Sequence, residues 1–182
     1  MSEATIERGV ASDAAASELA ELAWRIVENG ILAGMIGATT VAVWFLILDL
    51  LTRGVPFFTP SLLGSILFAH ATPDEVTSLS GAAIFAYTGL HGILFLFAGT
   101  VLAWMFTQLE RNPQVGLVLL LLFATFEAIL WGIGVSMIPA LAGVVGAWAI
   151  LVANVASAIA MFVFLLRRHP DALARLRQAW DD

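Results

Sequence analysis

Four long apolar stretches dominate the pattern of hydrophobic and polar positions along this chain. They lie at about residues 30–51, 79–109, 115–137 and 140–166. Each is long enough for a helix that crosses the hydrocarbon core of a bilayer, which takes about 20 residues. Asn112-Pro113 and Met137-Ile138-Pro139 make short connections between the last three stretches, and short connections join antiparallel neighbours. The pattern therefore predicts an all-α, four-transmembrane-helix bundle.

The connection between the first two spans is too long for a turn and too apolar for a free loop. Residues 59–69 are apolar but too few to cross a bilayer, so we expect a short outer helix that is interfacial or re-entrant. Thr59-Pro60 is typical of an N-cap followed by the first helical residue. Thr72 and Glu75 match a capping box, which indicates that the second span can begin at Pro73 and bend at Gly81.

The two ends of the chain are more polar than the spans. We expect a disordered tail at residues 1–12, an amphipathic interfacial helix at 13–29 and a C-terminal interfacial helix at 170–182. The first 28 residues carry six acidic side chains and no apolar core, so the pattern predicts no secretory signal peptide.

The arginines set the expected orientation, because cytoplasmic loops of membrane proteins are enriched in positive charge. With the N-terminus inside, the cytoplasmic side holds all the arginines except Arg53. The sequence therefore predicts a multi-pass protein of the bacterial inner membrane with both termini in the cytoplasm.

Composition agrees with a membrane protein. The chain has 182 residues, suited to one domain, and is 60% hydrophobic but only 12% charged, against about 25% charged in soluble domains. The net charge of −6 argues against nucleic acid as a partner. The absence of cysteine excludes disulfides, thiol catalysis and cysteine-ligated metals.

Small residues repeat at helical spacing on three of the spans. In lipid, such stripes let helix backbones approach closely. They predict packing interfaces within one bundle, in a homo-oligomer or in a larger membrane complex. The stripes are Gly30, Gly34 and Ala38; Ala124, Ala128 and Gly132; and Ala142, Gly146, Ala149, Ala153 and Ser157.

Polar side chains inside the spans are the candidate site. Asp49 and Arg53 lie one helical turn apart near the outer end of the first span, which predicts an interfacial ion pair. A second set lies roughly 18 Å from the outer ends at the helical rise, so we expect one polar layer with His91 facing Glu127. This intramembrane polar site consists of His91, Glu127, Asn154, Tyr87 and Thr40.

Two interpretations of this layer stay open. It can be a hydrogen-bonded network that fixes the packing, or a site for a proton relay, a metal, a haem, a quinone or a lipid head group. Neither a metal-binding histidine pair at one depth nor a nucleotide-binding or catalytic motif is present in the sequence, so no metal and no cofactor is predicted.

Two segments carry a resemblance. They are Pro56-Phe57-Phe58-Thr59-Pro60 with Leu62-Leu63-Gly64, and Arg167-Arg168-His169-Pro170. In overall pattern the chain resembles small bacterial four-span integral membrane proteins of no known activity. The resemblance supports the fold and implies no activity. We expect a non-enzymatic membrane subunit or accessory protein that packs through its Gly/Ala stripes. The alternative is a small redox, proton-relay or quinone- or lipid-binding membrane protein that uses the His–Glu–Asn layer.

Overall fold

The computed structural model describes residues 3–137 and 145–181, and the regular elements of this part are all helices, without a strand. Its elements in chain order are α1 (Glu3–Arg53), α2 (Phe58–Ala69), the 3₁₀ turn η1 (Pro73–Glu75), α3 (Gly81–Arg111), α4 (Pro113–Met137), α6 (Ala147–Arg168) and α7 (Asp171–Asp181).

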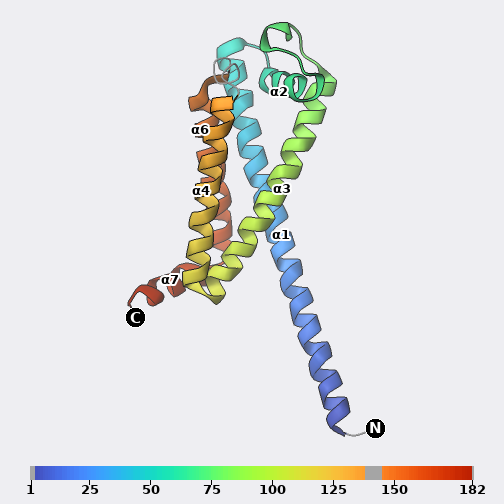
Figure 1. Cartoon of the computed structure of the whole chain (residues 1–182), viewed down its shortest axis with the longest axis vertical. Helices are drawn as coiled ribbons and strands as arrows, with labels where there is room; N and C mark the ends of the chain where they lie inside the picture. Colours follow the sequence, from blue (N-terminus) through green and yellow to red (C-terminus); the bar gives the residue numbers. More distant parts are fainter. Residues whose placement is uncertain (1–2, 138–144, 182) are drawn as a thin grey trace.

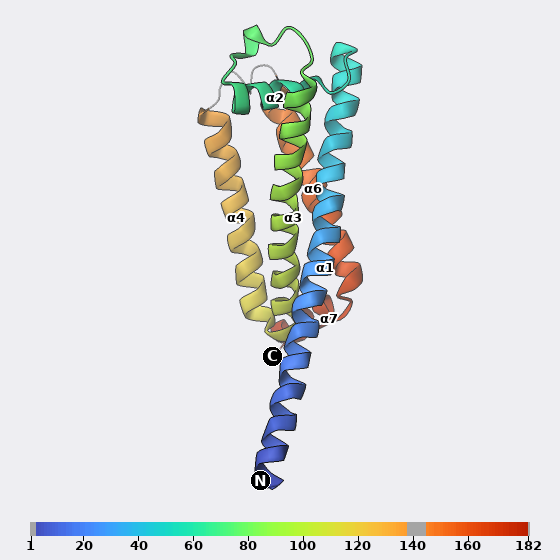
Figure 2. The same ribbon diagram turned by 90° about the vertical axis from the view of Figure 1, so that its right-hand side faces the viewer.

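The long helices run up and down side by side. Helices α1 and α4 run toward the upper end in Figure 1, and α3 and α6 run back. Helix α2 lies across the upper end, α7 lies at the lower end, and the N-terminal part of α1 projects well below the bundle (Figures 1 and 2). Both termini therefore lie toward the same end of the molecule.

Three helices of the described part are long and apolar enough to cross a membrane: α1 over Asp13–Arg53, α3 and α6. Helix α2 and the Pro113–Ile129 part of α4 are shorter apolar helices. A helical membrane protein is therefore supported, while the fourth span stays a prediction. The expected connection at Met137-Ile138-Pro139 extends beyond the described residues.

Helix α1 differs from the expectation of a disordered tail, an interfacial helix and a separate first span. The structure has one helix from Glu3 to Arg53. Alanine and glutamate are frequent before residue 30 and favour helix, and the first proline of the chain is Pro56. With no proline to break the helix, the polar segment continues directly into the apolar one.

Glycines bring α1 and α3 into backbone contact. A Cβ added at Gly30 would overlap the backbone of Thr100, and one at Gly34 would overlap that of Phe95. Gly99 of α3 faces the backbones of Gly30 and Gly34 in return. The small stripe of the first span is therefore a packing interface within this chain, as close approach in lipid requires.

The described part of the small stripe of the fourth span packs inside the chain as well, while Ala142 lies outside the described residues. Ala149, Ala153 and Ser157 of α6 are buried, and α6 packs on α1. The indole N–H of Trp44 on α1 donates to the carbonyl oxygen of Ala149 at 3.0 Å. This bond ties the upper part of α1 to the first turn of α6.

Helix α4 stands apart from this packing. It packs on α3 beside their shared turn, where Gly116 contacts Leu109, and on α7. Farther along, Ala124 and Ala128 are exposed. An added Cβ at Gly132 would meet nothing within 4 Å in the described part of the chain. The stripe of the third span is therefore left uncovered.

Two boundaries near the upper end differ from the expectation. Helix α2 begins at Phe58, one residue before the expected N-cap Thr59, and Phe57 precedes it with a φ of 63°. The capping box forms, but Pro73–Glu75 is an isolated 3₁₀ turn. Helix α3 begins only at Gly81, after the N-cap Ser80, whose hydroxyl oxygen accepts from the N–H of Ala83 at 3.3 Å.

Candidate functional site

The upper end of the bundle is closed by α2, which Asp49 holds at its first turn. The carboxylate of Asp49 is buried, with 1% of the residue exposed. The backbone N–H and the hydroxyl of Thr59 each donate to one of its oxygens at 2.7 Å. Two bonds from a helix N-terminus to one carboxylate fix both the position and the direction of α2.

The middle of α2 is held by α3. The hydroxyl oxygen of Ser61 accepts from the backbone N–H of Ser80 at 2.9 Å. A Cβ at Gly64 would overlap the backbone of Ala83, so the two helices touch at that point. Helix α2 is therefore a fixed roof over the upper part of the bundle.

A cavity of about 250 Å³ lies under this roof. Helix α1 lines it with Val41 and Phe45, and α2 contributes Leu63. The remaining walls come from α3 and the beginning of α6. They are Tyr87, His91, Phe95, Val145, Ile150 and Asn154. The walls are mainly apolar and aromatic, with three polar groups among them.

Three rings of α3 stand in a row along the cavity, because residues four apart share one face of a helix. The rings of Tyr87 and His91 are stacked, with centroids 5.8 Å apart and 25° between their planes. His91 and Phe95 are closer, at 4.6 Å and 46°. The imidazole thus has one aromatic neighbour a turn before it and another a turn after it on α3.

The structure brings together three of the five residues predicted for the polar layer. Tyr87, His91 and Asn154 line one cavity. Asn154 lines the cavity and is also exposed to the surroundings. Thr40 is half-buried, and its hydroxyl donates to the carbonyl oxygen of Ile36 in its own helix at 2.8 Å.

Glu127 lies apart from these residues. Its side chain is exposed on α4 and is not part of the cavity lining. The described contacts of His91 are with Ala38, Tyr87 and Phe95. The expected facing of His91 and Glu127 stays a prediction. Helices α3 and α4 separate upward from their shared turn, so equal depth does not bring their side chains together (Figures 1 and 2).

The predicted ion pair of Asp49 and Arg53 also stays a prediction. The contacts seen for Asp49 are those with Thr59. The guanidinium carbon of Arg53 lies 4.2 Å from the centroid of the Phe58 ring, in a cation–π contact. Sequence reasoning missed Thr59 as the partner of Asp49, because ten residues separate the two along the chain.

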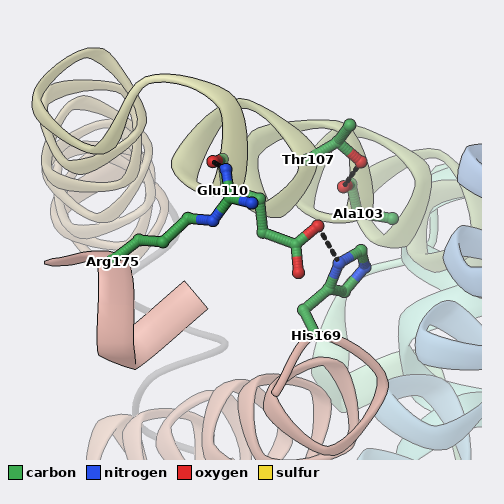
Figure 3. A network of polar contacts seen from close by, with 5 residues as sticks. All are labelled: Ala103, Thr107, Glu110, His169 and Arg175. Atoms are coloured by element: carbon green, nitrogen blue, oxygen red, sulfur yellow. Dashed lines mark hydrogen bonds and ion pairs between the residues drawn. The ribbon is translucent and has the colours of Figure 1, made fainter. Parts of the chain in front are cut away.

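A second polar cluster closes the lower end of the bundle (Figure 3). His169, which follows α6, places Nδ1 3.0 Å from a carboxylate oxygen of Glu110 on α3. Arg175 of α7 donates to the backbone carbonyl oxygen of Glu110 at 2.6 Å. The cluster therefore joins the ends of α3 and α6 to α7. A basic group at the last carbonyls of a helix stabilises that end, so the bond of Arg175 supports the end of α3.

The described residues contain no group of three or more His, Asp or Glu side chains that could hold a metal ion. Comparison of the chain with protein-family models, curated proteins and solved structures finds no match. Any functional inference therefore rests on the residues and geometry of this chain.

Proposed function

We propose that this chain is a four-span membrane protein of the bacterial inner membrane that binds a small lipophilic molecule in the cavity under α2. The single observation behind the binding role is a cavity that combines apolar and aromatic walls with a few converging polar groups. That combination is typical of small-molecule sites. It favours binding over the packing network considered from the sequence.

The four-span part of the proposal is supported by α4 and the arginines. Helix α4 has 25 residues, enough for a crossing, and a single residue separates it from α3. The basic ends of α3 and α6 and the whole of α7 lie at the lower end of the molecule, while α1 reaches the upper end at Arg53 (Figure 2). The lower end is therefore the cytoplasmic one in this proposal.

The size of the cavity limits what it can hold. An apolar cavity of about 150 Å³ is enough for one benzene molecule. The cavity here, at about 250 Å³, therefore has room for one substituted ring or a short branched chain. A larger lipid can place only its end there.

A cavity-filling variant tests the binding role. Leu63→Phe adds bulk to the lining residue of α2, and Leu67→Phe adds the same bulk one turn later at an exposed position. We expect mass spectrometry of the gently purified wild-type protein to detect a retained lipophilic molecule. Leu63→Phe should lose it and Leu67→Phe should keep it. Equal retention by both variants, or no retained molecule in the wild type, would contradict the proposal.

The uncovered stripe of α4 favours a second candidate function, that of a membrane subunit. The stripes of α1 and α6 are used inside the chain, whereas Ala124 and Ala128 stay exposed on α4. Small exposed residues at helical spacing suit a second helix in lipid. Cysteine at Ala128 should then form a disulfide-linked dimer in native membranes, while cysteine at Leu122, on another face of α4, should not. Equal cross-linking at both positions would argue against a specific interface.

A further inference from the structure

The chemistry of the ligand depends on the hydrogen-bonding state of His91. The structure places Nε2 of His91 3.4 Å from the backbone carbonyl oxygen of Ala38, across the α1–α3 contact. A carbonyl oxygen can only accept, so the proton of the imidazole is on Nε2 in this arrangement. A charged imidazolium is costly in the hydrocarbon region, which favours the neutral ring. Nδ1 is then an acceptor.

Nδ1 is available to a ligand. Among the described residues it has no hydrogen-bond partner, and it is not one of the enclosed polar atoms without a partner. His91 lines the cavity, and we infer that a molecule in that space meets this nitrogen. The Tyr87 hydroxyl and the Asn154 amide can each donate or accept, so they do not restrict the ligand. Nδ1 does restrict the ligand, because this acceptor needs a hydrogen-bond donor on the ligand.

The walls of the cavity restrict the remainder of the ligand. Phe45, Tyr87 and Phe95 are three of its lining residues, and aromatic rings pack well edge-to-face or offset against another flat ring. The space holds about one substituted ring, as argued above. A flat ring packs against the aromatic walls, and an O–H group on that ring can donate a hydrogen bond to Nδ1.

We propose that the cavity selects lipophilic phenols, including hydroquinones, whose hydroxyl donates a hydrogen bond to Nδ1 of His91. This proposal rests on the proposed function, because it names the ligand class of the same cavity. In this proposal the bond of His91 to Ala38 has a use, because it holds the proton on Nε2 and leaves Nδ1 as the acceptor.

Two probes that differ only in the donor test the proposal. They are 4-pentylphenol and its methyl ether, 4-pentylanisole, and neither needs a redox partner. Binding is measured by equilibrium dialysis against the full-length protein in lipid nanodiscs, with empty nanodiscs to subtract partition into lipid. We expect the wild-type protein to bind the phenol about three- to tenfold more tightly, as one additional hydrogen bond supplies.

Variants of His91 test whether this side chain causes the preference for the phenol over its methyl ether. His91→Phe keeps a ring but removes the acceptor, so the ratio of the two affinities should fall to about one. His91→Asn keeps an acceptor at the position of Nδ1 and should retain most of the preference. If His91→Phe does not fold, the ratio of the phenol and ether affinities in the wild type and in His91→Asn still decides the test.

The outcomes separate the two levels of the proposal. Equal binding of phenol and ether by the wild type, abolished in both cases by Leu63→Phe, would overturn the donor preference and leave the cavity as a binding site. A preference that persists unchanged in His91→Phe would overturn the role of His91. If neither probe binds beyond the empty nanodiscs, or if Leu63→Phe binds both as the wild type does, the proposed function itself fails.

Discussion

At the scale of single residues, the structure uses its few buried polar groups as fixed connections between helices. Asp49 binds the start of α2, Ser61 binds the start of α3, and Trp44 binds the start of α6. The first two bonds use backbone N–H groups at the start of a helix, which have no partner within the helix. The third reaches a carbonyl oxygen in the first turn of α6. These three contacts position the walls and roof of the cavity.

Removing the carboxylate of Asp49 should release α2. In Asp49→Ala the N–H and hydroxyl of Thr59 lose their acceptors in a buried place, which costs about 2–5 kcal/mol in the free energy of unfolding. Hydrogen exchange of residues 58–69 should rise together with the loss of thermal stability. Thr52→Ala is the matched control, because its hydroxyl is exposed and bonds only its own helix. Unchanged exchange in Asp49→Ala would show that α2 is held by other contacts.

Glu75 provides a pH-dependent contact outside the spans. The backbone N–H and the side chain of Thr72 hold the pKa of Glu75 below its ordinary value of 4.5. A lowered pKa in the folded state means that the contact stabilises η1 above pH 4.5 and is lost as the pH falls through the lowered pKa. The amide signal of Thr72 in NMR should therefore titrate with a midpoint below 4.5, and Glu75→Gln should remove this titration. A midpoint above 4.5 would contradict the capping interaction.

At the scale of elements, the packing of α1 on α3 depends on glycine. A side chain at Gly34 meets the backbone of Phe95 and Leu96, whereas one at Gly89 of α3 meets nothing within 4 Å in the described structure. Gly34→Leu should therefore lower the free energy of unfolding by about 1–3 kcal/mol or more, since overpacking displaces two helices. Gly89→Leu should leave stability unchanged or raise it slightly. Chemical unfolding in detergent, followed by circular dichroism, measures the difference, and similar losses in both variants would refute the interpretation.

Much of the element pattern could be predicted from the sequence, because hydrophobic length and turn residues act locally. The long apolar helices, the α2 helix and the Asn112 turn follow directly from apolar runs and prolines. The site could be predicted only in part. Counting residues gives depth along a helix, but it does not give the lateral separation of α3 and α4 that leaves Glu127 outside the cavity. The partner of Asp49 was missed for a similar reason, because Thr59 reaches it only after the chain reverses at Phe57.

At the scale of the whole molecule, the absence of cysteine makes the proposed topology simple to test. Single cysteines at Ala71 and Gln178 place one label in the upper connection and one in α7. On intact cells, a membrane-impermeant thiol reagent should label the first and not the second, because the two lie on opposite sides of the proposed membrane. Labelling of both sites after permeabilisation is the control, and labelling at Gln178 in intact cells would reverse the orientation.

The length of helix α1 gives the molecule a mechanical property that neither its polar segment nor its apolar segment has alone. Since it is one helix from Glu3 to Arg53, the segment before Gly30 behaves as a rigid arm of about 40 Å at the helical rise. A tilt of α1 by about 10° at its glycine contact with α3 would move the tip of that arm by about 7 Å. Small displacements beside the cavity are thereby converted into large ones at the opposite end of the same rod.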